Sequence, residues 1–303
     1  MFSSSIDKGN HNSRLCSAQW LSENIENVKV LDCSWYLPTM KRDVEKEFNS
    51  LRIKNSIFFG IDTIKDHSTD LPHMIPTETE FNKYMEENGI SNSDQIVLYD
   101  TFGFQGACRV LWNLEAFGHK NVQILSGGFE EWKKLGFPIE TTPFEKSPHH
   151  NSGYSSKINQ DLIVTKSQIL AAIKELQQSN GESGPIVIDA RPSARFNGAE
   201  PEPRPGLTSG HMPFAINVPF PNVFYKSPSS GGVFLKPVPE LVQIFEANGL
   251  KDVGDRQIIT TCGSGITAAC LYVSLKEANY KNVAVYDGSW AEYGSDPSNP
   301  HTS

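Results

Sequence analysis

Residues 257–270 place a cysteine where a thiol can act as a nucleophile. A β-branched run over 258–261 predicts a strand that ends at Cys262, and apolar spacing over 268–275 predicts a helix. Between them, Gly263 and Gly265 let backbone N–H groups turn inward, so an anion could bind at the start of the helix. A cysteine that only fills a core needs no such glycines. We therefore expect Cys262 to ionise more readily than a free cysteine and to attack an electrophilic atom.

The loop sequence Cys-Gly-Ser-Gly-Ile-Thr-Ala, starting at Cys262, resembles the active-site loop of sulfurtransferases with tandem rhodanese domains. The resemblance is to the 3-mercaptopyruvate sulfurtransferase form of this loop. Rhodaneses that prefer thiosulfate usually carry basic residues at the positions of Gly263 and Ser264. Protein tyrosine phosphatases need an arginine six positions after the cysteine, where this chain has Ala268. The resemblance implies a persulfide on Cys262 and a loop that holds substrate through Gly263, Gly265, Ile266 and Thr267.

Two arginines are candidates for binding the donor, because 3-mercaptopyruvate presents a carboxylate and a ketone. Arg195 and Arg204 lie in a segment that resembles the family's Gly-Arg-Phe and Glu-Pro-Glu-Pro-Arg motifs, whose arginines bind substrate. Ala194 replaces the glycine of the first motif. Read without the resemblance, the segment is a solvated loop in which the two arginines pair with Glu200 and Glu202.

Ser264, His73 and Asp62 are expected to form a proton-handling triad. In mercaptopyruvate enzymes a serine two positions after the cysteine acts with a histidine and an aspartate from the first domain. The segments 58–62 and 71–76 match the family's motifs, although Gly60 replaces one aspartate. A histidine that titrates near neutral pH suits general acid–base catalysis. On this reading the active site lies between the domains; otherwise His73 is a turn residue and Asp62 a strand-end cap.

The chain repeats one α/β pattern twice. Strands are predicted at 28–33, 56–62, 95–100 and 122–125, and helices at 78–88, at 108–117 and from Gly127. The same order returns about 160 residues later, as in 95–97 against 257–259. This alternation predicts parallel sheets flanked by helices. We expect an α/β protein of two tandem rhodanese-like domains at 14–141 and 161–295, joined by a linker at 142–160.

The repeat places Asp100 opposite Cys262, so the first copy lacks the thiol. Its loop over 101–106 also carries aromatic residues where the second copy is small. The first domain is therefore expected to be catalytically inactive, and the resemblance implies that it helps to form the wall of the site. Other conspicuous residues are read as structural: His211, Cys270, Trp132 and Trp290. Asp189 and Arg191 are expected to pair near the loop, without an assigned role.

The composition of the chain bears on its binding partners and its compartment. The formal net charge of −8 argues against direct nucleic-acid binding, and no apolar run is long enough for a membrane span. Five dispersed cysteines fit a protein of a reducing compartment, and their spacing is not that of a metal site. We expect no metal and no organic cofactor. The N-terminus, 1–14, is no secretory signal and a feeble mitochondrial presequence. We expect a monomer in the cytoplasm, with the mitochondrion as the alternative.

Together with the resemblance, the position of Cys262 predicts an enzyme that moves a sulfane sulfur from 3-mercaptopyruvate through a Cys262 persulfide to a thiol or cyanide, releasing pyruvate. The acceptor is a small thiol, a thioredoxin-like protein or a sulfur carrier of tRNA thiolation. Two alternatives stay open: a thiosulfate sulfurtransferase, and a relay protein whose persulfide is consumed only by a docked tRNA-thiolation partner.

Overall fold

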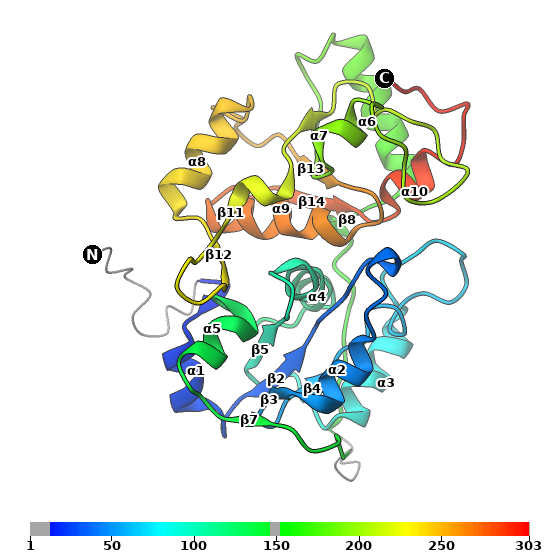
Figure 1. The fold of residues 1–303 in the computed structure, drawn as a ribbon. Helices are drawn as coiled ribbons and strands as arrows, with labels where there is room; N and C mark the ends of the chain where they lie inside the picture. Colours follow the sequence, from blue (N-terminus) through cyan, green and yellow to red (C-terminus); the bar gives the residue numbers. More distant parts are fainter. Residues whose placement is uncertain (1–12, 146–151, 303) are drawn as a thin grey trace. The chain divides into compact units, whose positions relative to one another are not determined.

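The chain forms two units, and each is built on its own five-stranded parallel sheet (Figure 1). The computed structural model describes residues 13–145 and 152–302. Most of the N-terminal segment 1–14, which makes only a feeble presequence, and residues 146–151 of the predicted linker lie outside the described residues. The predicted α/β fold class, with two repeated domains that each contain a parallel sheet flanked by helices, is confirmed.

The first sheet has the strand order β1-β6-β5-β2-β4, and each neighbouring pair is parallel. Its strands are β1 (Leu15–Cys16), β2 (Lys29–Asp32), β4 (Ile57–Phe58), β5 (Ile96–Tyr99) and β6 (Val122–Leu125). The first unit also contains the antiparallel pair β3 (Arg52–Ile53) and β7 (Ile139–Glu140). Its helices are α1 (Ala18–Asn24), α2 (Val44–Ser50), α3 (Glu78–Glu87), α4 (Gln105–Ala116) and α5 (Gly128–Lys134).

The second sheet has the order β10-β9-β13-β14-β8, which is the first order read from its other edge. Its strands are β8 (Ile163–Val164), β9 (Ile186–Asp189), β10 (Ile216–Asn217), β13 (Ile258–Thr261) and β14 (Val283–Tyr286). Its helices are α6 (Lys166–Gln178), α7 (Ser193–Phe196), α8 (Val238–Ala247), α9 (Ile266–Glu277) and α10 (Ser289–Tyr293). A short ladder pairs β11 (Phe224–Lys226) with β12 (Val233–Leu235). The two sheets therefore have the same strand order, so the repeat in the sequence is also a repeat of the fold.

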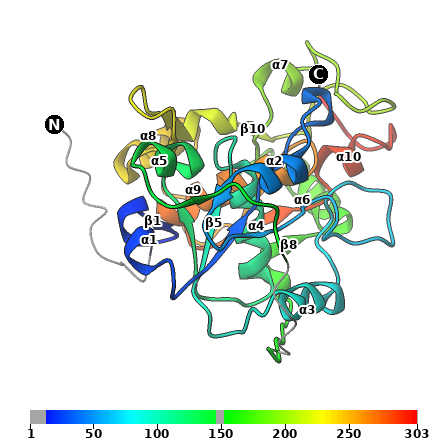
Figure 2. The same ribbon diagram turned by 60° about the horizontal axis from the view of Figure 1, so that its bottom comes forward.

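Each unit packs one central helix along its sheet. α4 lies against β5 and β6 in the first unit, and α9 lies against β13 and β14 in the second (Figures 1 and 2). Both helices are buried along almost their whole length. α9 is apolar on nearly every side, as expected of a helix inside a core, whereas α4 also buries Arg109 and Asn113. The loop before each helix is therefore held between a buried strand and a buried helix. Within the described residues, no helix is long and apolar enough to cross a membrane.

The units are not two uninterrupted halves of the chain. The first unit comprises the chain up to Lys65, Pro76–Ile158 and Lys226–Phe234; the second comprises Asp66–Ile75, Asn159–Tyr225 and Leu235 onward. Each half therefore lends a short segment to the other unit. The predicted domain boundaries treated each half as continuous.

Two local predictions need correction. The strand predicted over 56–62 ends at Phe58, because the chain turns at Gly60, whose carbonyl accepts the N–H groups of Thr63 and Ile64. The helix predicted from Cys108 begins at Gln105, three residues earlier. The predicted helix over 78–88 is confirmed: a capping box of Thr77 and Glu80 starts α3.

Candidate active site

Cys262 follows directly on β13, in the middle of the second sheet. Thr261 pairs with Asp189 of β9, and α9 begins four residues after the cysteine. Gly265 occupies the N-cap of α9 with a φ of 81°, in the left-handed region that glycine adopts without strain. Cys262 is 2% exposed. The predicted strand–loop–helix is therefore present, with the thiol at the carboxyl end of a central parallel strand.

The first turn of α10 holds the loop in shape. The N–H groups of Trp290 and Ala291 donate to the carbonyls of Cys262 and Gly263, at 2.9 and 2.8 Å. In a trans peptide the carbonyl and the following N–H point in opposite directions. The N–H groups of Gly263 and Ser264 are therefore turned away from α10. This orientation is what an anion-binding loop requires.

The first unit contains the corresponding loop, and there the loop surrounds the carboxyl group of Asp100. Asp100 follows β5 as Cys262 follows β13, and its carbonyl accepts the N–H of Phe129 in α5, just as the Cys262 carbonyl accepts that of Trp290 in α10. Both oxygens of the Asp100 side chain accept backbone N–H groups at 2.7–3.2 Å, and the donors are Phe102, Gly103, Phe104, Gly106 and Ala107. Burial raises the pKa of the Asp100 carboxyl, and these backbone hydrogen bonds oppose that rise because they favour the carboxylate. The repeat thus shows a carboxyl group held through backbone N–H groups by this type of loop within the same chain.

His73 and Ser264 come together within the second unit. The His73 Nδ1 atom lies 3.2 Å from the Ser264 hydroxyl oxygen and 3.4 Å from its carbonyl oxygen. Both residues are buried. Asp62 lies in the first unit, where its exposed carboxylate accepts the Trp35 Nε1–H at 3.2 Å. Its part in the triad stays a prediction.

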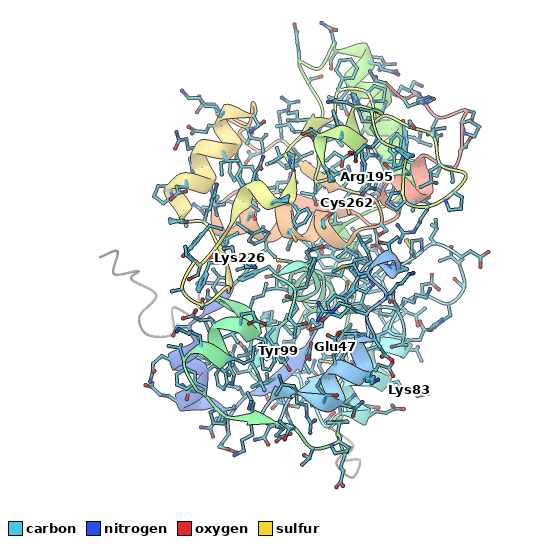
Figure 3. All side chains as sticks on the ribbon, in the orientation of Figure 1. Glu47, Lys83, Tyr99, Arg195, Lys226 and Cys262 are labelled. Atoms are coloured by element: carbon cyan, nitrogen blue, oxygen red, sulfur yellow. The ribbon has the colours of Figure 1, made fainter. Side chains whose placement is uncertain are left out.

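Arg195 approaches the active-site loop. A Cβ added at Gly263 would lie 3.0 Å from the terminal Nη2 of Arg195, so the guanidinium group rests almost against the loop backbone. Figure 3 shows Arg195 close to Cys262, in the same unit. Arg195 lies on α7 and is partly exposed, with 18% of its side chain accessible. Arg204 is half-buried on the loop that follows α7, and its role in binding stays a prediction.

Arg195 is held by a buried charge network that the sequence reading did not assign to the site. Glu202 accepts from Arg195 and, at 2.7 Å, from Arg191. Arg191 also donates to both oxygens of Asp189 and lies over the Trp290 ring. Burial alone lowers the pKa of a guanidinium group, but the carboxylates of Asp189 and Glu202 raise that of Arg191. The acidic residues that lie between Arg195 and Arg204 in the sequence were the feature from which this charge network could have been predicted.

The other residues singled out in the sequence occupy the positions that were expected of them. Ile266 and Thr267 form the first turn of α9, the former buried and the latter half-buried. His211 is structural: its Nδ1 lies 2.9 Å from the Phe196 carbonyl and its ring stacks on Phe196. Cys270, Trp132 and Trp290 are completely buried, and the five cysteines are free and buried.

Comparison with known proteins places this site in a family. The model of the rhodanese-like domain matches residues 17–135 and again 172–296. The chain therefore belongs to the family of proteins built from rhodanese-like domains, and it carries two of them.

Its relatives are named as sulfurtransferases. The probable 3-mercaptopyruvate sulfurtransferase of Schizosaccharomyces pombe is 39% identical, over 91% of this chain and 89% of its own length. Thiosulfate/3-mercaptopyruvate sulfurtransferase 1, mitochondrial, of Arabidopsis thaliana is 36% identical, over 94% and 76%. The crystal structure of Escherichia coli SseA, described as a 3-mercaptopyruvate sulfotransferase, superposes with a TM-score of 0.78 at 32% identity, over 92% of this chain and 99% of that one.

Proposed function

We propose that this protein is a sulfurtransferase that moves a sulfane sulfur from 3-mercaptopyruvate, through a persulfide on Cys262, to a thiol or cyanide. The observation that carries the proposal is the position of Cys262, in a loop whose counterpart in the first unit holds a carboxyl group through backbone N–H groups. A persulfide anion is what such a loop would stabilise. The names of its relatives support the same donor.

The loading step needs a nucleophile and a proton donor. The Cys262 thiolate attacks the sulfur of 3-mercaptopyruvate, forming an S–S bond while the C–S bond breaks. The electron pair of the C–S bond stays on carbon as the enolate of pyruvate. One proton must then reach that carbon to give pyruvate, and the sulfur remains on Cys262.

Each predicted residue takes one part of this step. Arg195, beside the loop, and Arg204 bind the carboxylate and the ketone of the donor. The N–H groups of Gly263, Gly265, Ile266 and Thr267 hold the sulfur anion. His73 and Ser264, at hydrogen-bond distance, supply the proton, and Asp62 orients the histidine.

The unloading step returns the enzyme to its start. An acceptor thiolate attacks the outer sulfur, forms a new persulfide and releases the Cys262 thiolate, so no oxidant or reductant is consumed. We propose a small thiol or a thioredoxin-like protein as acceptor, with a sulfur carrier of tRNA thiolation as the alternative. The protein is proposed to act as a monomer in the cytoplasm or, like the relative named mitochondrial, in that organelle.

Thiosulfate is the second candidate donor, and one contact favours it. The loop has no basic residue at positions 263 and 264, but the guanidinium group of Arg195 lies against Gly263 and supplies a positive charge there. A guanidinium can bind a dianion as well as a carboxylate. The Arabidopsis relative is named for both donors. The pairing of Arg195 with Glu202 offsets part of that charge, which favours 3-mercaptopyruvate.

Mass spectrometry of the intact protein tests the proposal. Incubation with 3-mercaptopyruvate should add one sulfur atom, located on Cys262 by peptide analysis, with pyruvate released in equal amount. Cys262→Ser should gain no sulfur and lose turnover while its circular dichroism is unchanged. Cys270→Ser, which alters a buried cysteine of the same helix region, is the matched control and should load normally. Sulfur on another cysteine, or turnover by Cys262→Ser, would refute the assignment.

A further inference from the structure

The segment Asp66–Ile75 carries His73 into the unit that contains Cys262. The Asp66 N–H donates to the Met74 carbonyl at 3.0 Å, so the segment closes on itself. His73 has a φ of 61°, in the left-handed region that a residue with a Cβ rarely adopts. Such a conformation persists only where surrounding contacts impose it. The position of the imidazole therefore depends on how the segment is anchored.

Asp287 provides an anchor two residues from His73. It follows β14 directly, is 1% exposed, and its Oδ2 accepts the Ile75 N–H at 2.7 Å. A polar side chain is costly to bury unless it is hydrogen-bonded, and Asp287 meets that cost in part by accepting the Ile75 N–H.

The internal repeat shows that the fold itself does not require this carboxylate. Ser126 occupies the corresponding place in the first unit, directly after β6 and before the Gly127–Gly128 turn. Gly288 and Ser289 follow Asp287 in the same way. Asp287 thus occurs in the unit that contains both Cys262 and the segment that carries His73.

We propose that Asp287 is a positioning residue: by accepting the Ile75 N–H it fixes the segment Asp66–Ile75 so that the His73 imidazole stays against the Ser264 hydroxyl. The inference rests on the proposed proton transfer by His73 and Ser264. Asp287 acts through His73 and touches neither the donor nor the sulfur. Its loss should therefore affect the step that needs the proton.

Three variants of the full chain separate the hydrogen bond from the charge. Asp287→Asn keeps an oxygen acceptor, Asp287→Ala removes it, and Asp287→Ser copies the first unit. With 3-mercaptopyruvate, we expect kcat to fall by about ten- to a hundredfold in Asp287→Ala, and by less than about threefold in Asp287→Asn. With thiosulfate, which needs no enolate protonation, each variant should stay within about threefold of the parent. Asp287→Ser should behave like the alanine variant and serves in its place if that variant does not fold.

Hydrogen exchange provides a readout that does not depend on activity. Peptides covering 66–75 should exchange faster in Asp287→Ala than in the parent, and those of β13 and α9 should be unchanged. His73→Ala is the matched control, because it removes the imidazole and keeps the Ile75–Asp287 hydrogen bond. Unchanged exchange at 66–75 in both Asp287→Ala and Asp287→Ser would overturn the proposal.

A double-mutant cycle decides whether Asp287 works through His73. In a His73→Ala background, Asp287→Ala should lower kcat no further. An undiminished loss there, or an equal loss with both donors, would mean that Asp287 supports the Cys262 loop itself, and would overturn the proposal. If His73→Ala alone left kcat with 3-mercaptopyruvate unchanged, the proposed proton transfer would fail, while faster exchange at 66–75 would still support the anchor.

Discussion

The imidazole of His73 lies 3.2 Å from the hydroxyl of Ser264, although the two residues are 191 positions apart in the chain. Ser264 follows the candidate nucleophile by two residues on a loop between β13 and α9. His73 arrives on a segment lent by the first half of the chain. The unit that holds the thiol is thus completed by residues from outside its own sequence range.

Replacing His73 should affect one donor more than the other. With 3-mercaptopyruvate, His73→Ala should lower kcat on the order of a hundredfold, because the enolate loses its proton source. With thiosulfate the loss should be much smaller. Steady-state kinetics with both donors measures the ratio. Asp62→Asn should give the same preference in weaker form, and an equal loss with both donors would assign His73 a structural role.

Glu202 should control the position of Arg195. Glu202→Ala removes the carboxylate that pairs with Arg195, while Arg191 keeps Asp189 as its buried partner. Removing one member of a buried ion pair costs about 3–5 kcal/mol of unfolding free energy, which is the upper limit here because Arg195 is partly exposed. Chemical denaturation measures this loss. Glu202→Gln should raise KM for 3-mercaptopyruvate more than it lowers kcat. Glu200→Gln, a change at an exposed neighbour, is the control and should alter neither quantity.

The absence of a side chain at Gly263 should allow Arg195 to take up its position beside the loop. Gly263 does not have a left-handed φ, so Gly263→Ala strains no backbone but places a Cβ about 3.0 Å from the guanidinium. Displacing the arginine should lower kcat/KM for 3-mercaptopyruvate by about tenfold, the value of one charge-assisted hydrogen bond. In an Arg195→Ala background the substitution should have little effect. A loss that persists there would place the cause in the loop itself.

Donor preference should shift when the loop is made basic. Changing Gly263 and Ser264 together to arginine and lysine should raise kcat/KM for thiosulfate and lower it for 3-mercaptopyruvate. Positive charge favours the dianion, while the hydroxyl that contacts His73 is lost. The ratio of the two efficiencies is the measurement, and an unchanged ratio would contradict this view of the loop.

Asp32 should make the first unit less stable as the pH rises. Burial raises the pKa of its carboxyl from 3.8 to about 6, against opposing hydrogen bonds from Ser34. The folded state therefore binds the proton more tightly than the unfolded chain. The resulting stability is complete below pH 3.8 and is lost as the pH rises through about 6. It amounts to at most about 3 kcal/mol, because one pKa unit equals about 1.36 kcal/mol.

Denaturation between pH 4 and pH 8 checks this prediction. Asp32→Asn should be increasingly more stable than the parent as the pH rises, because the amide never ionises. Asp189, the counterpart of Asp32 on β9, is paired with Arg191, so Asp189→Asn should instead destabilise the protein at neutral pH. Equal pH profiles for Asp32→Asn and the parent would contradict the argument.

The sequence by itself determined the α/β repeat, the position of Cys262 after a strand, and the difference between Cys262 and Asp100. These features depend on residues within one strand, loop and helix, where hydrophobic spacing and glycines act locally. Resemblance added the arginines and the triad. Strand ends were less predictable: β4 stops at Phe58 because of the turn at Gly60.

Only the tertiary structure decided which distant residues meet. It brought His73 to Ser264, set Arg195 against Gly263, and buried Glu202 between two arginines. It also brought the Asp287 carboxylate to the Ile75 N–H, across 212 positions of sequence. Hydrogen bonds and ion pairs of this kind depend on the packing of β13, β14 and α10 around the loop. Because their partners are separated by whole elements, no local pattern of residue types encodes them.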